Sequence, residues 1–233
     1  MNEEYSLYYW GAIQGRGEFP RLIFEEAGVP YNDVGRGRDG QARVRAMRED
    51  AGPFAPPILQ VGTLVLGQTA VICDALAERF DLVPTNQRRM AMQHQLSIAD
   101  AVVEAHDTHH PLGAMLHYEE QIEAAKQRAR SYREHRLPKW LRYFDQQIDN
   151  AGGAWLLGDV FSYVDLSLFQ LVEGLRFAFP RAMHTYERSA PQVVRAHAAV
   201  RERPRIAAYL RSNRRIPFNN HGLFRHYPEL DQP

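Results

Sequence analysis

Residues 5–31, YSLYYWGAIQGRGEFPRLIFEEAGVPY, decide the fold of this chain. The aromatic-rich run 5–10 predicts a β-strand, because aromatic side chains favour strands. A glycine-rich turn follows it. Residues 18–27 then carry apolar side chains at helical spacing, and Gly28 stands where a helix would stop. Residues 29–34 predict a second strand, so the segment has the order strand, helix, strand.

The next stretch adds a hairpin and another helix. Residues 58–61 and 63–66 are apolar runs on either side of Gly62, which predicts a β-hairpin. Residues 69–80 return to helical spacing. Before this hairpin, residues 35–53 are rich in Gly, Arg and Asp, and we expect a surface loop there that can include a short helix. The order β-α-β followed by β-β-α is typical of a thioredoxin-like α/β domain.

The pattern changes after residue 84. From about residue 88 to residue 210 the periodicity is helical, with few strand signals. The boundary is therefore expected within residues 81–87. This predicts two domains: a thioredoxin-like domain over 1–84, and an all-α helical domain over 88–233.

Composition limits the classes of function. The 233 residues carry 28 basic and 28 acidic side chains, so no charge excess favours nucleic acid or an anionic membrane. Cys73 is the only cysteine, which excludes a disulfide within the chain. No signal-peptide pattern opens the sequence, and no apolar run approaches the roughly 20 residues that span a bilayer. We expect a cytoplasmic protein.

Four segments carry a family resemblance. Segment 5–31 resembles the opening of cytosolic glutathione transferases of the tyrosine type, the alpha, mu, pi and sigma group. Residues 56–59, PPIL, look like the family's Pro-x-Leu element, whose proline is cis. Gln68-Thr69 looks like the Gln-Ser pair that grips glutathione, and residues 158–165, GDVFSYVD, look like the family's Gly-Asp-x-x-Ser-x-x-Asp element. Each motif alone is weak, but four in order with family-like spacing are specific.

The resemblance implies an enzyme of detoxification. Its members conjugate the thiolate of glutathione, their co-substrate, to small apolar electrophiles. They are usually homodimers, and the helical domain supplies the second-substrate pocket. We therefore expect a glutathione S-transferase homodimer, with no nucleic-acid or membrane partner.

The resemblance assigns the catalytic hydroxyl to Tyr9. Conjugation needs a thiolate, and a free thiol with a pKa of about 8.5 is mostly protonated at neutral pH. A hydroxyl that donates a hydrogen bond to the sulfur favours the charged form. Tyr8 is the alternative, because neighbouring strand residues point to opposite faces and only one of the two can face the sulfur. Two strand aromatics that only fill a core are the plain structural alternative.

The other predicted glutathione contacts also follow from the resemblance. Gln68 and Thr69 would hold the γ-glutamyl carboxylate, and Thr69 can also cap the helix that begins there. Pro57 is the expected cis-proline. The family residue before it pairs its backbone with the cysteinyl part of glutathione, but here that residue is Pro56, which has no N–H and can only accept.

A cation is needed for the glycyl carboxylate of glutathione. Family members often use a Lys or Trp before the cis-proline, and this loop contains neither. Arg48 lies nearest the family's lysine spacing, with Arg45 as the alternative. Arg16, in the glycine-rich turn, would add positive field near the sulfur. A solvated loop arginine is an equally good interpretation of Arg48.

Further residues have structural interpretations. His106, His109 and His110 suggest a metal site, but Pro111 follows at once and no second ligand cluster is evident, so we expect no metal. Ser162 and Asp165 fit a helix capping box. Cys73 is interpreted as a small core residue.

The second-substrate pocket is harder to predict. Tyr118, His110 and Met115 are candidates for its lining. Asp100 and Glu104 lie on the first long helix, where some relatives send an acid across the dimer to glutathione.

Two alternative functions stay open. One is a glutathione-dependent isomerase or peroxidase on the same scaffold. The other is a non-catalytic relative that binds apolar ligands or partner proteins, and Pro56 and the absence of a Lys or Trp in the loop before it favour this reading. Because one fold hosts many functions, the choice rests on the site residues.

Overall fold

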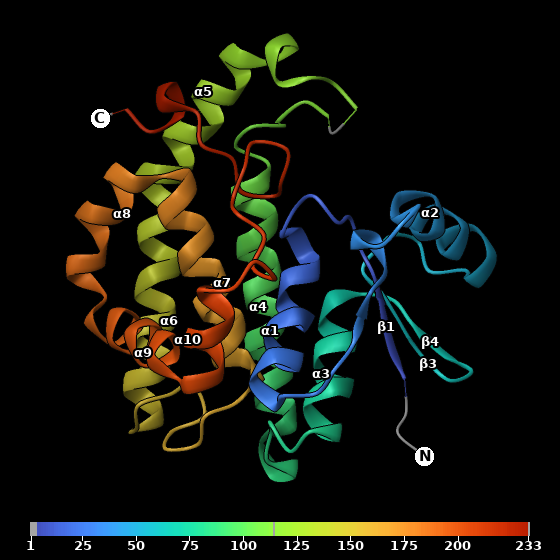
Figure 1. The fold of residues 1–233 in the computed structure, drawn as a ribbon. Coiled ribbons are helices and arrows are strands. Elements are labelled where there is room, and N and C mark those ends of the chain that lie inside the picture. The colour runs from blue at the N-terminus through green and yellow to red at the C-terminus, as the bar shows by residue number, and fades with distance from the viewer. Residues whose placement is uncertain (1–3, 114, 233) are drawn as a thin grey trace.

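The computed structural model describes residues 4–113 and 115–232. Its first part forms a four-stranded sheet with three principal helices. In Figure 1, α2 lies on one side of the sheet, and α1 and α3 lie between the sheet and the remaining helices. In chain order the elements of this part are β1 (Tyr5–Tyr8), η1 (Gly15–Gly17), α1 (Glu18–Ala27), β2 (Asn32–Asp33), η2 (Val34–Arg36), α2 (Gly40–Ala51), β3 (Ile58–Val61), β4 (Leu64–Leu66) and α3 (Thr69–Arg79).

The sheet has the strand order β2-β1-β3-β4. β1 is parallel to β2 and antiparallel to β3, and β3 and β4 form an antiparallel hairpin. Gly62 turns that hairpin with a φ of 57°, a conformation that glycine adopts without strain. Along β1, Tyr5 and Leu7 are buried while Ser6 and Tyr8 are only partly so, which is the alternation of a strand with one core face. The predicted hairpin and the thioredoxin-like arrangement are confirmed.

Helix α1 begins and ends at the predicted residues. Its apolar side chains Phe19, Leu22, Ile23 and Phe24 are all buried, since they form the stripe that faces the core. Gly28 ends the helix in the left-handed region with a φ of 68°.

Two predictions for the segment between α1 and β3 were wrong. The second strand is shorter than residues 29–34, because it covers only Asn32–Asp33 and the chain then turns into η2. The expected surface loop over 35–53 contains the 12-residue helix α2. Alanine, arginine, methionine and glutamate favour a helix even with little apolar pattern. Val44, fully buried, anchors this otherwise exposed helix.

The second part is helical, as predicted. Ser162 and Asp165 form the expected capping box at the start of its central helix. The Asp165 carboxylate accepts from the backbone N–H of Ser162 at 2.8 Å and from that of Leu156 at 3.0 Å. The elements are η3 (Thr85–Gln87), α4 (Arg88–His106), η4 (Tyr118–Glu120), α5 (Ile122–Ser131), η5 (Tyr132–Arg136), α6 (Leu137–Ala151), α7 (Tyr163–Ala178), α8 (Pro180–Tyr186), η6 (Glu187–Ser189), α9 (Pro191–Glu202), α10 (Pro204–Leu210) and η7 (Pro228–Leu230).

The buried apolar side chains form one cluster across both parts. It extends from Tyr5 to Leu230 and includes Cys73, which is fully buried as expected of a core residue. The division at residues 81–87 falls between α3 and α4 and stays a prediction. None of the helices in the described ranges has the length and apolar character needed to cross a bilayer.

Candidate active site

Tyr9 follows β1 directly, and its ring is enclosed by the glycine-rich turn. The side chain is 6% exposed and continues the buried face of Tyr5 and Leu7. A Cβ at Gly15 would lie 2.2 Å from the Tyr9 hydroxyl oxygen, and one at Gly17 would lie 2.5 Å from the ring. The turn therefore needs glycine at both positions to let the backbone approach the phenol.

Two arginines set the electrostatic surroundings of the Tyr9 hydroxyl. The backbone N–H of Arg16 donates to the hydroxyl oxygen at 2.9 Å, and the Arg21 guanidinium lies 5.8 Å from the ring centroid. Burial raises the pKa of Tyr9, while the hydrogen bond from Arg16 and the charges of Arg16 and Arg21 oppose that rise. The phenol is thus neutral at neutral pH. Because its oxygen accepts from Arg16, its proton is available for a second partner.

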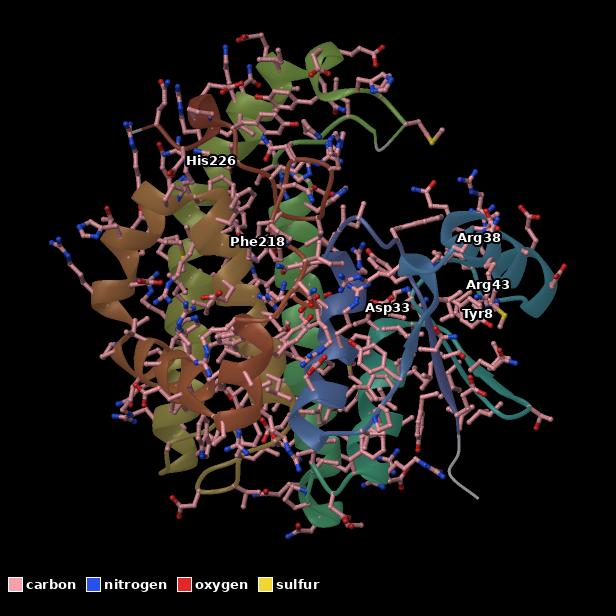
Figure 2. All side chains as sticks on the ribbon, viewed as in Figure 1. Tyr8, Asp33, Arg38, Arg43, Phe218 and His226 are labelled. Carbon is pink, nitrogen blue, oxygen red and sulfur yellow. The ribbon has the colours of Figure 1, made fainter. Side chains whose placement is uncertain are left out.

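Tyr8 points to the other face of the sheet. Its hydroxyl donates to Gln60 Oε1 at 2.9 Å, and Gln60 lies on β3. This is the face next to α2, and Figure 2 shows Tyr8 on the side of the sheet where Arg38 and Arg43 lie. The two candidate tyrosines therefore occupy opposite faces, as strand alternation predicts.

The strand register brings the remaining predicted motifs to the same end of the sheet. Tyr8 pairs with Ile58, so the next position along places Tyr9 beside Pro57. Leu59 pairs with Leu66, and two steps further place Pro57 beside Gln68. With strands about 4.8 Å apart, these three positions span roughly 10 Å. The Pro56–Pro57 peptide bond is cis, as predicted.

Gln68 and Thr69 lead into α3, but not as the predicted cap. Gln68 occupies the N-cap position with a φ of 65°, and no side chain caps the helix. Thr69 is instead the first helical residue. Its hydroxyl oxygen is buried without a hydrogen-bond partner at the N-terminus of the helix. Buried hydroxyls are normally satisfied, so this one is suited to a ligand oxygen.

Arg48 and Arg45 lie on α2 and are exposed. Arg48 pairs with its neighbour Glu49 at 3.6 Å, and its side chain is 43% exposed. Arg45 donates to Gln41 at 3.1 Å. Neither contact ties an arginine to the Tyr9 turn, so the cation for the glycyl carboxylate stays a prediction.

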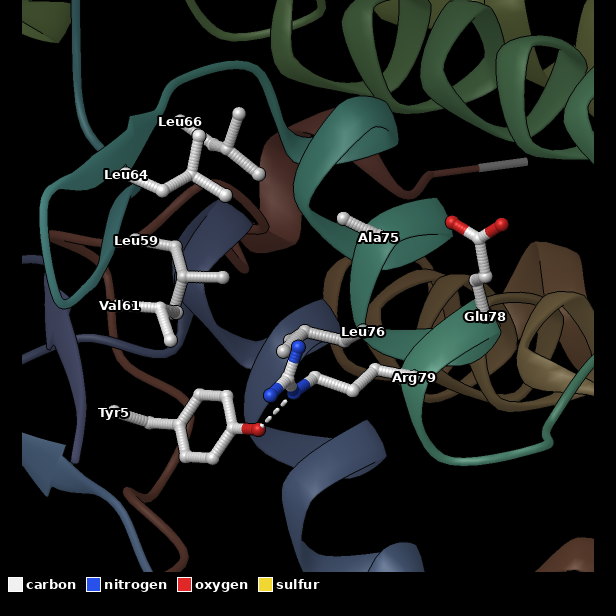
Figure 3. Close-up of a pocket in the computed structure, with 9 residues that line it drawn as sticks. All are labelled: Tyr5, Leu59, Val61, Leu64, Leu66, Ala75, Leu76, Glu78 and Arg79. Atoms are coloured by element: carbon white, nitrogen blue, oxygen red, sulfur yellow. Dashed lines mark hydrogen bonds between the residues drawn. The ribbon is translucent and has the colours of Figure 1, made fainter. Parts of the chain in front are cut away.

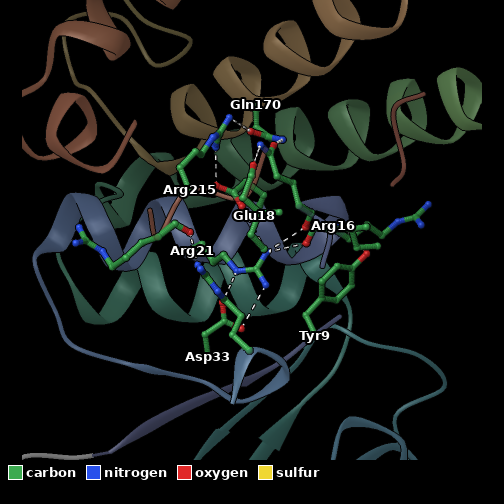
Figure 4. A network of polar contacts seen from close by, with 12 residues as sticks. Tyr9, Arg16, Glu18, Arg21, Asp33, Gln170 and Arg215 are labelled. Atoms are coloured by element: carbon green, nitrogen blue, oxygen red, sulfur yellow. Dashed lines mark hydrogen bonds and ion pairs between the residues drawn. The ribbon is translucent and has the colours of Figure 1, made fainter. Parts of the chain in front are cut away.

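A buried network of ion pairs beside Tyr9 was not predicted from the sequence. Arg21 donates to Asp33 at 2.8 Å and lies 3.4 Å from Glu18; the side chains of Glu18 and Arg21 are fully buried. Arg215 joins Glu18 at 2.5 Å and donates to Gln170 of α7 at 3.0 Å. Figure 4 shows the network beside Tyr9 and Arg16. Charged residues on the buried stripe of α1 were the available signal.

Two cavities differ in their relation to these residues. An apolar one of about 300 Å³ lies between the hairpin and α3, with the Tyr5–Arg79 hydrogen bond at its edge (Figure 3), and contains none of the predicted site residues. The other, of about 510 Å³, is lined by His110, Met115 and Tyr118 together with residues of the C-terminal tail. The three residues predicted for the second-substrate pocket thus line one cavity.

Comparison with known proteins agrees with this arrangement. The family model described as "Glutathione S-transferase, C-terminal domain" matches residues 106–213. The glutathione S-transferase of Plasmodium falciparum (isolate 3D7) is 25% identical over 196 residues, covering 80% of this chain and 87% of that protein. That of Plasmodium yoelii yoelii is 24% identical over 177 residues, covering 74% and 79%.

Solved structures share the fold over nearly the whole chain. The pi-class glutathione S-transferase of Onchocerca volvulus superposes with a TM-score of 0.74 at 21% identity, covering 94% of this chain and 99% of that one. The glutathione S-transferase of Ascaris lumbricoides gives 0.67 at 22% identity, covering 89% and 96%. The helical-domain match, the curated relatives and the shared fold agree in supporting membership of the cytosolic glutathione S-transferase family.

Proposed function

We propose that this protein is a glutathione transferase that joins the sulfur of glutathione to small electrophilic substrates. The observation that supports it most directly is the Tyr9 phenol, which is neutral, accepts a hydrogen bond from Arg16 and keeps its proton for a further acceptor. In the proposed reaction the thiol of glutathione releases its proton to solvent, and the Tyr9 hydroxyl donates a hydrogen bond to the thiolate that forms. The thiolate attacks the electrophilic carbon, a C–S bond forms, and the leaving group departs with the bonding electron pair.

One hydrogen bond from the Tyr9 hydroxyl is strong enough to lower the pKa of the glutathione thiol to near neutrality. A hydrogen bond to a charged group contributes roughly 1.5–3 kcal/mol. At about 1.4 kcal/mol per pKa unit, it lowers the pKa of the thiol by roughly one to two units. From about 8.5, this brings the pKa of the thiol close to neutrality, where a large fraction is thiolate.

The other end of glutathione would meet the start of α3. The buried Thr69 hydroxyl and the positive end of the helix dipole suit the γ-glutamyl carboxylate. Gln68 and the carbonyl of Pro56 would complete the contacts, with Pro57 holding the turn. Arg48 is the proposed partner of the glycyl carboxylate.

The second substrate would enter the cavity lined by His110, Met115 and Tyr118. This wall mixes apolar and aromatic side chains with imidazoles and with the charged Arg225 and Glu119, which suits a small electrophile that carries a polar group. Conjugation of such compounds is a detoxification reaction. We further propose a cytoplasmic location.

A homodimer is proposed from the exposed apolar side chains. Phe54 is 94% exposed in the loop before β3. Leu96 and Val103, seven residues apart on one face of α4, are 51% and 45% exposed. Exposed apolar side chains that share one face, as Leu96 and Val103 do, are typical of an interaction surface.

A turnover assay with glutathione and a chromogenic aryl halide tests the proposal. Tyr9→Phe is expected to lose roughly 8- to 25-fold of the activity at neutral pH, which is the drop in the thiolate fraction when a pKa lowered by one to two units returns to about 8.5. Tyr8→Phe is the matched control and should stay close to wild type. Loss of activity in Tyr8→Phe alone would overturn the assignment to Tyr9.

The non-catalytic candidate has one specific observation in its favour. Pro56 lacks the N–H that would pair with the cysteinyl part of glutathione. Wild-type protein that binds glutathione on an affinity matrix but turns over neither aryl halides nor peroxides would favour this candidate.

A further inference from the structure

Three histidine rings meet where the chain leaves α4. His106 is the last residue of the helix, and the next turn is tight, because the backbone N–H of His109 donates to the carbonyl of His106 at 3.2 Å. Thr108 fixes the turn by donating its hydroxyl to Ala105 at 2.7 Å. His110 follows directly. The turn therefore brings three imidazoles together, although Pro111 follows them at once.

The three histidine rings lie close enough together for their nitrogens to bind one ion. The ring centroids of His106 and His109 lie 4.9 Å apart, those of His109 and His110 4.9 Å, and those of His106 and His110 5.4 Å. One nitrogen from each ring lies within 4.8 Å of those of the other two. An ion about 2.0–2.1 Å from each nitrogen therefore requires a modest inward rotation of the rings.

Each ring can offer a lone pair. His109 is 1% exposed, and its Nε2 is buried without a hydrogen-bond partner. An unsatisfied buried nitrogen costs free energy unless something binds it.

Neighbouring side chains can orient two of the rings. His106 Nδ1 lies 3.3 Å from Asp107, a carboxylate that can fix the tautomer with Nε2 free for an ion. Gln121 Nε2 lies 3.0 Å from His110 Nδ1, and within 3.4 Å of three backbone carbonyls. The Gln121 amide has two protons and four acceptors within reach. It can therefore lose its hydrogen bond to His110 and still donate both protons to backbone carbonyls.

Charge and access limit which ions fit. The positive charges of Arg225 and Arg16 oppose a cation near the cluster, and Asp107 favours one. Three imidazoles without a directly ligating carboxylate suit zinc, copper or nickel rather than Mg²⁺ or Ca²⁺. His110 also lines the cavity of about 510 Å³, which gives an ion a route in and leaves space for a water or ligand as fourth donor.

We propose that His106, His109 and His110 form a binding site for one divalent transition-metal ion. The site lies at the end of α4, beside the proposed second-substrate cavity, and is separate from Tyr9. It revises the expectation of no metal. The proposal does not depend on the transferase activity, because the binding of an ion to the three imidazoles is measured without glutathione or a second substrate.

The test uses untagged full-length protein stripped with a chelator and kept free of glutathione. Zn²⁺ is titrated in competition with a chromophoric chelator, and Co²⁺ is followed by its visible absorption. Wild type should bind one ion per chain. His106→Gln and His109→Gln should each weaken binding by more than about 10-fold, and Asp107→Asn by about 10-fold as expected for an orienting partner.

Controls separate this site from surface histidines. His135→Gln and His184→Gln, both at exposed positions, should bind the ion like wild type. Circular dichroism reports whether each variant is folded. If the buried His109 variant does not fold, His106→Gln decides, because that side chain is 26% exposed. Less than one ion per wild-type chain, or unchanged affinity in His106→Gln, overturns the proposal.

Discussion

At the scale of single residues, the candidate site depends on two hydroxyl groups that can form a further hydrogen bond. Within the described residues, neither hydroxyl donates its proton to another group of the protein. The Thr69 hydroxyl is buried without a hydrogen bond at the start of α3. The Tyr9 hydroxyl accepts from Arg16 and keeps its proton available. Such groups make the unliganded protein less stable than it could be, so they are expected to gain their partners when the ligand binds.

The Thr69 prediction separates binding from stability. Thr69→Val removes an unsatisfied hydroxyl while keeping the branched shape, so the free energy of unfolding of the unliganded protein should stay constant or rise. Loss of a hydrogen bond to a carboxylate, roughly 1.5–3 kcal/mol, should weaken glutathione binding by at least about 10-fold.

Denaturant melts and glutathione calorimetry measure both quantities for this variant. Thr185→Val, on the exposed side of α8, is the control and should change neither. Unchanged glutathione affinity in Thr69→Val would contradict the assigned contact.

Some of the candidate site residues could be predicted from the sequence and others could not, for physical reasons. Strand alternation separates Tyr8 from Tyr9, and the family resemblance of residues 56–59 predicted the cis bond before Pro57. The capping interpretation of Thr69 was wrong, because Gln68 takes the N-cap position with a positive φ of 65° that no local pattern in the sequence predicts. The partnership of Glu18 with Arg215 joins residues almost 200 positions apart and depends on tertiary packing.

At the scale of elements, a strong apolar periodicity in the sequence predicted a helix and its bounds correctly. Where this periodicity was weak, the helix was not predicted. Helix α1 has a clear apolar stripe and matches the predicted bounds. Helix α2 buries little beyond Val44, so its pattern resembled that of a loop. Glu104 was considered as a glutathione contact across the dimer. In the structure it forms a two-pronged ion pair with Arg136, at 2.6 and 2.7 Å, which joins α4 to η5.

This ion pair gives a pH-dependent prediction. The hydrogen bonds from Arg136 are the main cause that lowers the pKa of Glu104 in the folded protein. A carboxyl with a lowered folded pKa stabilises above its unfolded pKa of about 4.3, and this contribution is lost as the pH falls through the folded value.

Glu104→Gln should therefore cost up to about 1 kcal/mol at pH 7, since the pair is partly exposed. The difference from wild type should vanish near the acid limit. Urea melts at several pH values measure it, with Glu123→Gln, an exposed pair with Lys126, as control. A Glu104→Gln deficit that persists unchanged in acid would contradict the ion-pair account.

At the scale of the whole molecule, one continuous core joins the sheet part to the helical part. The overall order of strands and helices was predictable, because the change from mixed to helical periodicity is sharp near residue 84. The sequence analysis grouped His106, His109 and His110, but the contact of their three rings depends on a tight turn after α4 that helical spacing does not predict. The proposed homodimer also belongs to the scale of the whole molecule. The exposed side chain of Phe54 is the main observation that supports it.

Removing the Phe54 side chain tests the proposed dimer. Burying a phenylalanine contributes about 1.5–3 kcal/mol, and a two-fold dimer contains two copies. Phe54→Ser should therefore raise the dimer dissociation constant by roughly 100-fold or more. Sedimentation velocity measures it. Met115→Ser is the control, because Met115 is 95% exposed near the second-substrate cavity and should leave the dimer intact. A monomeric wild type, or an unaffected variant, would contradict this interface.

The most direct measurement is a pH titration of glutathione bound to the protein, followed by the ultraviolet absorbance of its sulfur anion. The account predicts a bound thiol with a pKa roughly one to two units lower in wild type than in Tyr9→Phe, and no such difference for Tyr8→Phe. Identical titrations of bound glutathione in wild type and Tyr9→Phe would contradict the account.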